Sequence, residues 1–338
     1  MSDGPYIDLP QDQYAHASAT SEWWWHIGTL RSGDRLFGFE ITASGYPANS
    51  PTPFAMTQIM LTDVANQRHY QQTNPFVPYP VDFAQSDPRK PWYVGLVGAP
   101  FGSGDVVMRA PKSNPLSMRV QAMFSDKASA KEIGFDLHFQ QQAAPMLIWG
   151  TGRSPVPAVG GEYNYYYSLT HLQAAGEILI GDEVVPVTGT TWMDHEYGGF
   201  PPSTMWVLQN MQLDNGVHIM NFASNTAPVR GQAMASNATV LTPDGRSTYY
   251  ENGPTCTPQD PWESGGVTYY LTWLVSIPAL DATFEVKSLM PDQLFSWESP
   301  VYEGVAHSTG QMAGQEVSGT AWIEQRLPPA PVSPASDC

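Results

Sequence analysis

Charge is scarce in this sequence of 338 residues. Charged residues make up 14% of the chain, against about 25% in an average soluble protein. Basic residues are the scarcer kind, because 15 Lys and Arg stand against 32 Asp and Glu and leave a formal net charge of −17. A chain with this balance is repelled by phosphate backbones and by anionic lipid surfaces. The composition therefore predicts no nucleic-acid partner.

Long apolar runs and a set of paired cysteines are also missing. No segment approaches the roughly 18 apolar residues that a membrane span needs, so we expect no membrane span. Two cysteines, Cys256 and Cys338, cannot form a disulfide framework, and we expect both thiols to be unpaired. The start of the chain, Met1 to Ser18, has no basic region and no apolar core, so it does not resemble a signal peptide. We expect a cytoplasmic protein, although a removed leader would leave no trace in the sequence.

The familiar catalytic motifs are absent as well. The chain has no G-x-S-x-G elbow, no H-E-x-x-H zinc helix, no paired C-x-x-C and no glycine-rich phosphate loop before a helix. These absences argue against a metal hydrolase and a nucleotide enzyme, and we expect neither a metal nor a cofactor. Aromatic residues, by contrast, make up 12% of the chain, with 11 Trp and 16 Tyr. Such side chains can line an apolar cavity for a hydrophobic small-molecule substrate.

Short runs of alternating polarity dominate the chain. Across residues 36–41, three apolar side chains (Phe37, Phe39 and Ile41) share one face, as in a half-buried strand. Similar runs lie at residues 133–139, 177–180, 217–222, 267–275 and 283–286. Turn residues such as Asp214-Asn215-Gly216 separate them. No segment keeps a 3.6-residue apolar period over several turns, so the pattern predicts an all-β fold.

A weak internal repeat divides the chain in two. The segment Val187–Asp194 (VTGTTWMD) recurs as Val317–Glu324 (VSGTAWIE), at an offset of 317 − 187 = 130 residues. A second match aligns Trp23 with Trp206, at an offset of 206 − 23 = 183 residues. Each half thus opens with a strand that bears a tryptophan and closes with a V-[ST]-G-T-x-W strand. We expect an N-terminal arm (1–20), a first β-domain (21–200), a second β-domain (201–328) and a Pro-rich tail (329–338).

The first candidate cluster is Glu22-Trp23-Trp24-Trp25-His26. In a strand, Glu22, Trp24 and His26 share one face, while Trp23 and Trp25 share the other. The first face therefore combines an acid, an indole and an imidazole. The alternative is structural, with the three tryptophans plugging one end of a barrel.

The second candidate cluster is the block WMDHEYGG at residues 192–199. Strand alternation divides it into two faces, Trp192, Asp194 and Glu196 on one and Met193, His195 and Tyr197 on the other. In the second half Glu324 takes the place of Asp194, which leaves open a purely structural role for this acid. The next residues of the second half are Gln325, Arg326 and Leu327, which match none of His195, Glu196 and Tyr197. This asymmetry favours a special site in the first half.

A tyrosine run lies upstream of that block, at residues 163–168 (YNYYYS). Tyr165 and Tyr167 share one face of a strand and can point inward, with hydroxyl groups that donate or accept a proton. The alternative is that the run consists of ordinary strand residues, since tyrosine has a high β-propensity.

Together these motifs resemble a known superfamily. They look like those of the hydroxyneurosporene synthase (carotenoid 1,2-hydratase) superfamily. The motifs are the E-W-W opening, the tyrosine run, the W-M-D-H-E-Y-G block and the ending Tyr302–Gly304 with Val317–Gly319. The resemblance implies two lipocalin-like antiparallel β-barrel or sandwich domains in tandem. The superfamily includes carotenoid and kievitone hydratases, which add water to a prenyl double bond without a cofactor. It also includes fungal lipocalin-like Diels–Alderases, so the resemblance implies the fold more firmly than the reaction.

The leading hypothesis is a cofactor-independent hydratase for a prenylated or polyene molecule. Burial raises the pKa of a carboxyl group, so a buried acid keeps a proton with which to protonate an alkene. We expect Asp194 to be this acid. We expect Trp24 and Trp192 to stabilise the cation through their ring faces, and His195 or Tyr166 to orient the water. The expected catalytic residues are Asp194, His195, Glu22 and Tyr166, and the expected substrate-binding residues are Trp24, Trp25, His26, Tyr165, Tyr167, Trp192, Glu196 and Tyr197.

Two alternative functions stay open. A pericyclase or cyclase would fold a polyene against aromatic side chains and polarise it with hydrogen bonds, so that catalysis is mainly an entropy effect. A lipocalin-like carrier would use the same pocket without turnover. In each case we expect a mainly apolar cavity near the domain interface, walled by Trp24, Trp25 and Tyr165. The sequence sets neither the substrate nor an oligomeric state.

Overall fold

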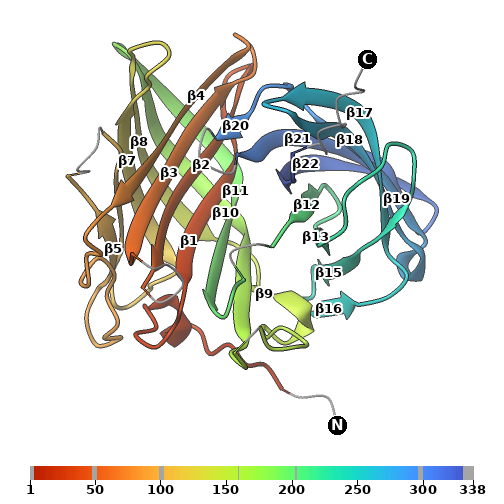
Figure 1. Ribbon diagram of the computed structural model, residues 1–338, viewed down its shortest axis with the longest axis horizontal. Coiled ribbons are helices and arrows are strands. Elements are labelled where there is room, and N and C mark those ends of the chain that lie inside the picture. Colours follow the sequence, from red (N-terminus) through yellow and green to blue (C-terminus); the bar gives the residue numbers. More distant parts are fainter. Residues whose placement is uncertain are drawn as a thin grey trace, which may run out of the picture.

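The chain folds into two curled antiparallel sheets that lie side by side (Figure 1). This computed structural model describes residues 4–47, 52–98, 103–158, 160–201, 204–295 and 300–329. Within these residues, each sheet has 11 strands and all the pairings are antiparallel. The all-β prediction is confirmed.

The first sheet has the order β4-β3-β2-β1-β11-β10-β8-β7-β6-β5, with β9 paired to β10. Its strands are β1 (Glu22–Ser32), β2 (Arg35–Tyr46), β3 (Phe54–Asp63), β4 (Arg68–Phe76), β5 (Trp92–Leu96), β6 (Asp105–Ala110), β7 (Ser117–Ser125), β8 (Glu132–Gln141), β9 (Met146–Leu147), β10 (Asn164–Ile180) and β11 (Glu183–Gly198). The sheet curls so that its two ends meet, because Thr57 on β3 and Asn74 on β4 donate hydrogen bonds to the carbonyl groups of Gly104 and Ser103, each over 2.7 Å.

The second sheet has the order β14-β17-β18-β19-β21-β22-β12-β13-β15-β16, with β20 paired to β21. Its strands are β12 (Trp206–Leu213), β13 (His218–Ser224), β14 (Met234–Ala235), β15 (Asn237–Leu241), β16 (Ser247–Tyr250), β17 (Thr255–Ser264), β18 (Val267–Ile277), β19 (Ala282–Ser288), β20 (Leu294–Phe295), β21 (Val301–Met312) and β22 (Gln315–Arg326). Taken from β16 to β14, this order repeats the order of the first sheet strand for strand.

The internal repeat is visible in the register of the sheets. Ile27 of β1 faces Trp192 of β11, and Asn210 of β12 faces Trp322 of β22. The two pairs are related by the offsets found in the sequence, since 210 − 27 = 183 and 322 − 192 = 130. The first and last strands of one half therefore pair as those of the other half do.

Buried residues form one cluster inside each sheet and a third between the sheets. The third cluster, which we call the intersheet layer, consists of Trp25, Ile27, Met60, Met146, Ile148, Tyr166, Trp192, Leu208, Met220, Leu241, Phe295, Val305 and Trp322. Residues of both sheets contribute to it, so the outer faces of the central strands are buried as well as their inner faces.

This layer corrects the expectation of half-buried strands. On β2, Phe37 and Phe39 lie inside the first sheet as predicted, but the opposite face is also covered by the second sheet. Glu40 is only 2% exposed. At Gly38 the sheets come so close that an added Cβ would lie 2.6 Å from the Cβ of Val305. The face of β2 that alternation predicts to be solvent-exposed therefore lies at the interface between the sheets, where Gly38 allows the two sheets to approach closely.

The N-terminal arm covers one end of the first sheet (Figure 1). It contains η1 (Gln11–Gln13), and Gln13 and Tyr14 are buried. The other described helices, η2 (Ile148–Gly150) and η3 (Pro278–Leu280), are also single turns, and no helix in the described ranges is long and apolar enough to cross a membrane. Cys256 is a buried free thiol, while Cys338 lies outside the described residues.

Candidate functional site

Strand alternation in β11 divides the candidate residues between two sites. Trp192 belongs to the intersheet layer, whereas Met193 and Tyr197 pack inside the first sheet. Asp194 therefore points toward the second sheet and His195 toward the interior of the first. The two faces read from the sequence are confirmed, but they belong to different sites.

The structure brings the predicted residues together in two groups. Asp194, Trp192, Glu196, Tyr166 and Trp25 lie at the intersheet layer, and Glu22, Trp24, His26, Tyr165, Tyr167, His195 and Tyr197 lie inside the first sheet. The expected single cavity walled by Trp24, Trp25 and Tyr165 is not found, because Trp25 faces the opposite side of β1 from Trp24. His195 and Trp24 likewise lie on the far side of the sheet from Asp194.

Asp194 is a fully buried carboxylic acid whose two oxygens differ. Oδ1 accepts hydrogen bonds from Ser168 Oγ over 2.5 Å and from the Trp192 indole over 2.7 Å. Oδ2 has no hydrogen-bond partner among the described residues. Burial raises the pKa of Asp194 to about 6, against the lowering effect of these two hydrogen bonds and of the contact with the Tyr166 hydroxyl group. The arrangement fixes the carboxyl group through Oδ1, and the raised pKa lets a larger share of Asp194 hold a proton near neutral pH than an exposed aspartic acid does.

Four further buried acids are linked to Asp194: Glu196 and Glu324 by direct charge interaction, and Glu40 and Glu303 through Glu324. The set, which we call the interface acids, consists of Glu40, Asp194, Glu196, Glu303 and Glu324, and none is more than 8% exposed. Burial, and then repulsion from neighbouring carboxylates, raises the pKa of Glu40 and Glu303 well above the usual range, and burial raises that of Glu324 to about 8. Like charges in a shared low-dielectric site cannot all ionise, so most of these groups hold a proton near neutral pH.

Hydrogen bonds hold these acids in place from both sheets. The Trp322 indole donates to Glu303 over 2.8 Å, as Trp192 donates to Asp194. Asn164 donates a short hydrogen bond to Glu196, whose pKa is raised well above normal by burial. Burial and the charge of Asp194 raise the pKa of Tyr166, so this hydroxyl group stays protonated. The intersheet site is therefore rich in protons and walled by indole rings.

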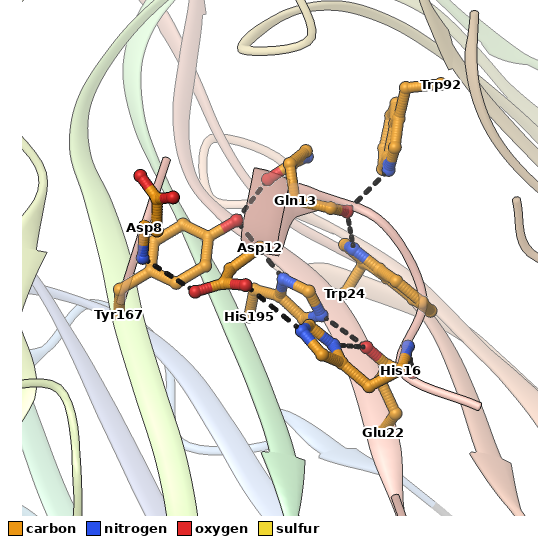
Figure 2. A network of polar contacts seen from close by, with 9 residues as sticks. All are labelled: Asp8, Asp12, Gln13, His16, Glu22, Trp24, Trp92, Tyr167 and His195. Atoms are coloured by element: carbon orange, nitrogen blue, oxygen red, sulfur yellow. Dashed lines mark hydrogen bonds and ion pairs between the residues drawn. The ribbon is translucent and has the colours of Figure 1, made fainter. Parts of the chain in front are cut away.

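The second site is a polar network inside the first sheet (Figure 2). Its centre is Glu22, whose Oε1 accepts hydrogen bonds from His16 Nδ1 over 2.8 Å and from His195 Nε2 over 2.9 Å. Burial raises the pKa of Glu22, but the two histidines outweigh that effect and bring it below its ordinary value. Burial lowers the pKa of His16, but Asp12 and Glu22 outweigh that effect and raise it to about 9. Glu22 is thus a carboxylate held between two imidazoles.

The far side of His195 is fixed as firmly as the near side. Its Nδ1 lies 3.1 Å from the hydroxyl group of Tyr167, which also makes a short hydrogen bond to the side chain of Gln13. The Gln13 carbonyl accepts the indole N–H groups of Trp24 and Trp92 over 3.2 and 2.7 Å (Figure 2). These contacts tie the N-terminal arm to the sheet interior. We call His16, Glu22, His195, Tyr167, Gln13 and Asp12 the inner network.

Two predicted site residues have no polar role among the described contacts. His26 stacks on Phe139 with ring centroids 5.0 Å apart, and neither of its ring nitrogens has a hydrogen-bond partner in the described structure. Burial lowers the pKa of His26 to about 3, so it is neutral. Tyr165 stacks on Tyr197 at 5.2 Å. These residues pack the interior of the first sheet.

Sequence reasoning missed part of each site. His16, Asp12 and Gln13 lie in the arm, which has no strand pattern that would link them to Glu22. Glu40 lies on a strand face that alternation predicts to be solvent-facing until the second sheet covers it, and Glu303 was not singled out in the sequence. The internal repeat does indicate one of the missed acids. Glu324 occupies the place of Asp194, so the two side chains face the same interface.

A separate groove of about 880 Å³ lies on the outer face of the first sheet. Its lining includes Tyr93, Arg109, Arg119 and His138, and none of the predicted site residues belongs to the part of its lining that is described. Its cations are on exposed strand positions, and Arg119 is paired with Asp136 over 2.5 Å. We therefore assign this groove no part in the reaction.

Comparison with known proteins agrees with the resemblance found in the sequence. A family model described as AttH-like matches residues 1–326. Dehydratase asqC of Emericella nidulans is 25% identical over 247 residues, which are 66% of this chain and 65% of that protein. The chain thus spans a little under two thirds of the length of this curated relative. The superfamily predicted from the sequence motifs is confirmed.

Solved structures show the same fold. A Nitrosomonas europaea protein described as an AttH has a TM-score of 0.75 at 21% identity, over 97% of this chain and 99% of that one. Kievitone hydratase from Nectria haematococca has a TM-score of 0.72 at 15% identity, over 96% and 93%. CghA with Sch210972 gives 0.51 at 11% identity, over 92% and 89%. At these identities the likeness concerns the fold alone.

Proposed function

The chain belongs to the AttH-like family, and we propose that it is a cofactor-independent enzyme that adds water to, or removes water from, a hydrophobic molecule. The substrate class we propose is a prenylated or polyene small molecule with a trisubstituted double bond. The intersheet site, and not the inner network, carries the reaction. Asp194 is the general acid.

The observation that carries this proposal is the half-paired carboxyl group of Asp194. An acid that protonates carbon needs a proton near neutral pH, a fixed position and an apolar surrounding. Asp194 is fully buried, its Oδ1 is held by Ser168 and Trp192, and its Oδ2 has no partner among the described residues. The dehydratase name of a relative that shares 25% of its residues over the aligned part supports the same reaction class.

The proposed reaction has two steps. The Oδ2 proton of Asp194 moves to the less substituted carbon of the double bond, whose π electrons form the new C–H bond. The positive charge left on the more substituted carbon lies against the indole rings of Trp192 and Trp25, which stabilise a cation through their ring faces. A water oxygen then bonds to that carbon, and the proton it loses returns to Asp194. Dehydration is the same sequence reversed, so one acid serves both directions.

The water needs an orienting group on the same side of the sheet as Asp194. Tyr166 meets this need, because its ring belongs to the intersheet layer and its hydroxyl group keeps its proton. His195, the other residue expected from the sequence, faces the sheet interior. We therefore assign the orientation of water to Tyr166 and not to His195.

A panel of prenylated and polyene compounds tests the proposed function. The full chain is incubated with each compound, and the products are weighed by mass spectrometry beside a buffer control. Hydration adds the mass of one water, and heavy-oxygen water must place its label in the product. Consumption without a mass change would instead indicate the cyclase. Binding in a thermal-shift assay without any turnover would indicate the carrier.

A further inference from the structure

The inner network contains three donor atoms that converge on one point. His16 Nδ1 and His195 Nε2 lie 2.8 and 2.9 Å from Glu22 Oε1, and all three donor atoms lie within 4.8 Å of one another. Two imidazole nitrogens and one carboxylate oxygen form a common ligand set of transition-metal sites in proteins. Ligand atoms around a metal at about 2 Å are separated by distances of this order.

We propose that His16, Glu22 and His195 bind one divalent transition-metal ion, of which zinc matches the donor set best. The ion would lie inside the first sheet, below the N-terminal arm, and bind two histidines from different parts of the chain. His16 belongs to the arm, Glu22 begins β1 and His195 is near the end of β11. Such an ion would fasten the arm to the sheet.

The partners of the two imidazoles support a metal site. A histidine that binds a metal usually has its other ring nitrogen held by a carboxylate, a carbonyl or another polar group, which fixes the ring and its tautomer. His16 Nε2 lies 3.4 Å from Asp12 Oδ1, and Asp12 in turn accepts the Asp8 backbone N–H over 2.6 Å. His195 Nδ1 lies 3.1 Å from the Tyr167 hydroxyl (Figure 2). Both ligands thus carry the orienting contact that metal sites require.

Aromatic rings stack on both imidazoles and fix their orientation. Tyr197 stacks on His16 with ring centroids 3.5 Å apart and planes 7° from parallel. Trp24 stacks on His195 at 4.6 Å and 25°. The ring positions are therefore set before any ion binds, which reduces the entropy lost on binding.

The charges of the network also fit a divalent cation. Once both imidazoles bind the ion, Glu22 and Asp12 supply two carboxylate groups in a largely buried place, and one divalent ion neutralises them. The His16 side chain is 23% exposed, so an ion can reach the site and keep a water ligand on that side.

The second half of the molecule indicates that the fold does not require this cluster. At the position equivalent to His195, Gln325 accepts a hydrogen bond from Tyr270 N–H and donates one to Tyr270 C=O, each over 2.9 Å. By the same offsets, Met205 stands in the place of Glu22. The same strand order is thus built with neutral residues in the second half. The fold alone therefore does not explain the charged triad of the first half, and a bound cation does.

The proposed ion is distinct from the proposed reaction site. His195 points to the opposite side of β11 from Asp194, so the ion does not touch a substrate bound between the sheets. Its role is to position the arm and β11. Direct binding measurements, which do not depend on activity, therefore test it separately from the proposed function.

The test uses the full chain stripped with a chelator and then titrated with zinc chloride in a calorimeter. We expect one ion per chain and a higher melting temperature, because the ion binds only the folded state. Cobalt(II) should replace zinc and give the visible absorption of a protein-bound ion. The Asp12→Asn variant should bind zinc about 10- to 100-fold more weakly, as expected for loss of a partner of a ligand.

Matched variants decide whether the assigned residues are the ligands. His16→Gln removes a partly exposed ligand in the arm, so this variant should fold and lose the binding of zinc and cobalt. His171→Gln, a partly exposed histidine outside the network, should bind as the unmodified chain does. Stripped protein that takes up no zinc, or His16→Gln and Glu22→Gln variants that still bind one ion equally tightly, would overturn the proposal.

Discussion

The last strands of the two sheets, β11 and β22, occupy equivalent places but hold different groups. Each carries a tryptophan that is followed two residues later by an acid, and both acids are buried at the interface. Beyond that point they diverge. His195 of β11 contacts Glu22 and Tyr167, whereas Gln325 of β22 binds only the backbone of Tyr270 among its described hydrogen bonds.

The surroundings of the two acids differ as well. Asp194 faces the hydroxyl group of Ser168 across the strand pair, and Glu324 faces another acid, Glu303. Asp194 accepts hydrogen bonds from neutral donors, whereas Glu324 lies against the carboxyl group of Glu303 and has a pKa that burial raises. The W-x-[DE] pattern therefore places an acid at the interface in both halves. The residue across the strand pair determines whether that acid is held by a neutral donor or lies against another acid.

The largest effect expected from this comparison concerns the two acids. Asp194→Asn keeps the shape of the side chain but removes the transferable proton, so turnover should fall about a hundredfold or more. Glu324→Gln should leave the turnover rate nearly unchanged. The measurement is the initial rate with a compound that the mass-spectrometric panel identifies, with folding checked by circular dichroism. Equal losses in both variants would show that the two acids act as one unit.

The fold could be predicted from the sequence because it depends on local patterns. Alternation gave the strands, and the two offsets relate the register of one half to that of the other, as Ile27 with Trp192 and Asn210 with Trp322 show. The assignment of faces within β11 was also correct. These features follow from strand geometry alone.

The division into two sites could not be predicted in the same way. Alternation tells which side chains share a face but not what covers that face, so Trp24 and Asp194 were assigned to one site. Glu40 lies on a face that becomes buried only when the second sheet packs on it. His16 reaches Glu22 through an arm without regular structure. Both facts depend on tertiary packing between segments far apart in the chain.

A second prediction concerns Gln325, the neutral counterpart of His195. Gln325→Leu leaves the N–H and C=O groups of Tyr270 without their partners in a buried place, which should lower the free energy of unfolding by about 2 kcal/mol. Urea denaturation measures the loss. The matched change Gln142→Leu at an exposed position should have little effect. If both variants are equally stable, the Gln325 contacts do not hold the second sheet together.

The smallest effect we expect is a change in the pH dependence of stability. The pKa of Glu324 rises from an ordinary value of 4.5 to about 8 in the folded chain, because burial disfavours its charge. The folded state therefore binds more protons than the unfolded state between these pH values, and stability must fall as pH rises through that window. Glu324→Gln should make the fall shallower in urea titrations at pH 5 and pH 8. An unchanged slope would mean that Glu324 is ionised in the folded chain.

Running the reaction in heavy water shows whether Asp194 protonates a carbon–carbon double bond. Exchange places deuterium on the carboxyl group of Asp194, so the product should carry one deuterium on the carbon adjacent to the one that bears the new hydroxyl group, as read by nuclear magnetic resonance. Asp194→Asn should form this deuterated product far more slowly. Product without carbon-bound deuterium, or deuterated product formed equally fast by the Asp194→Asn variant, would contradict the account.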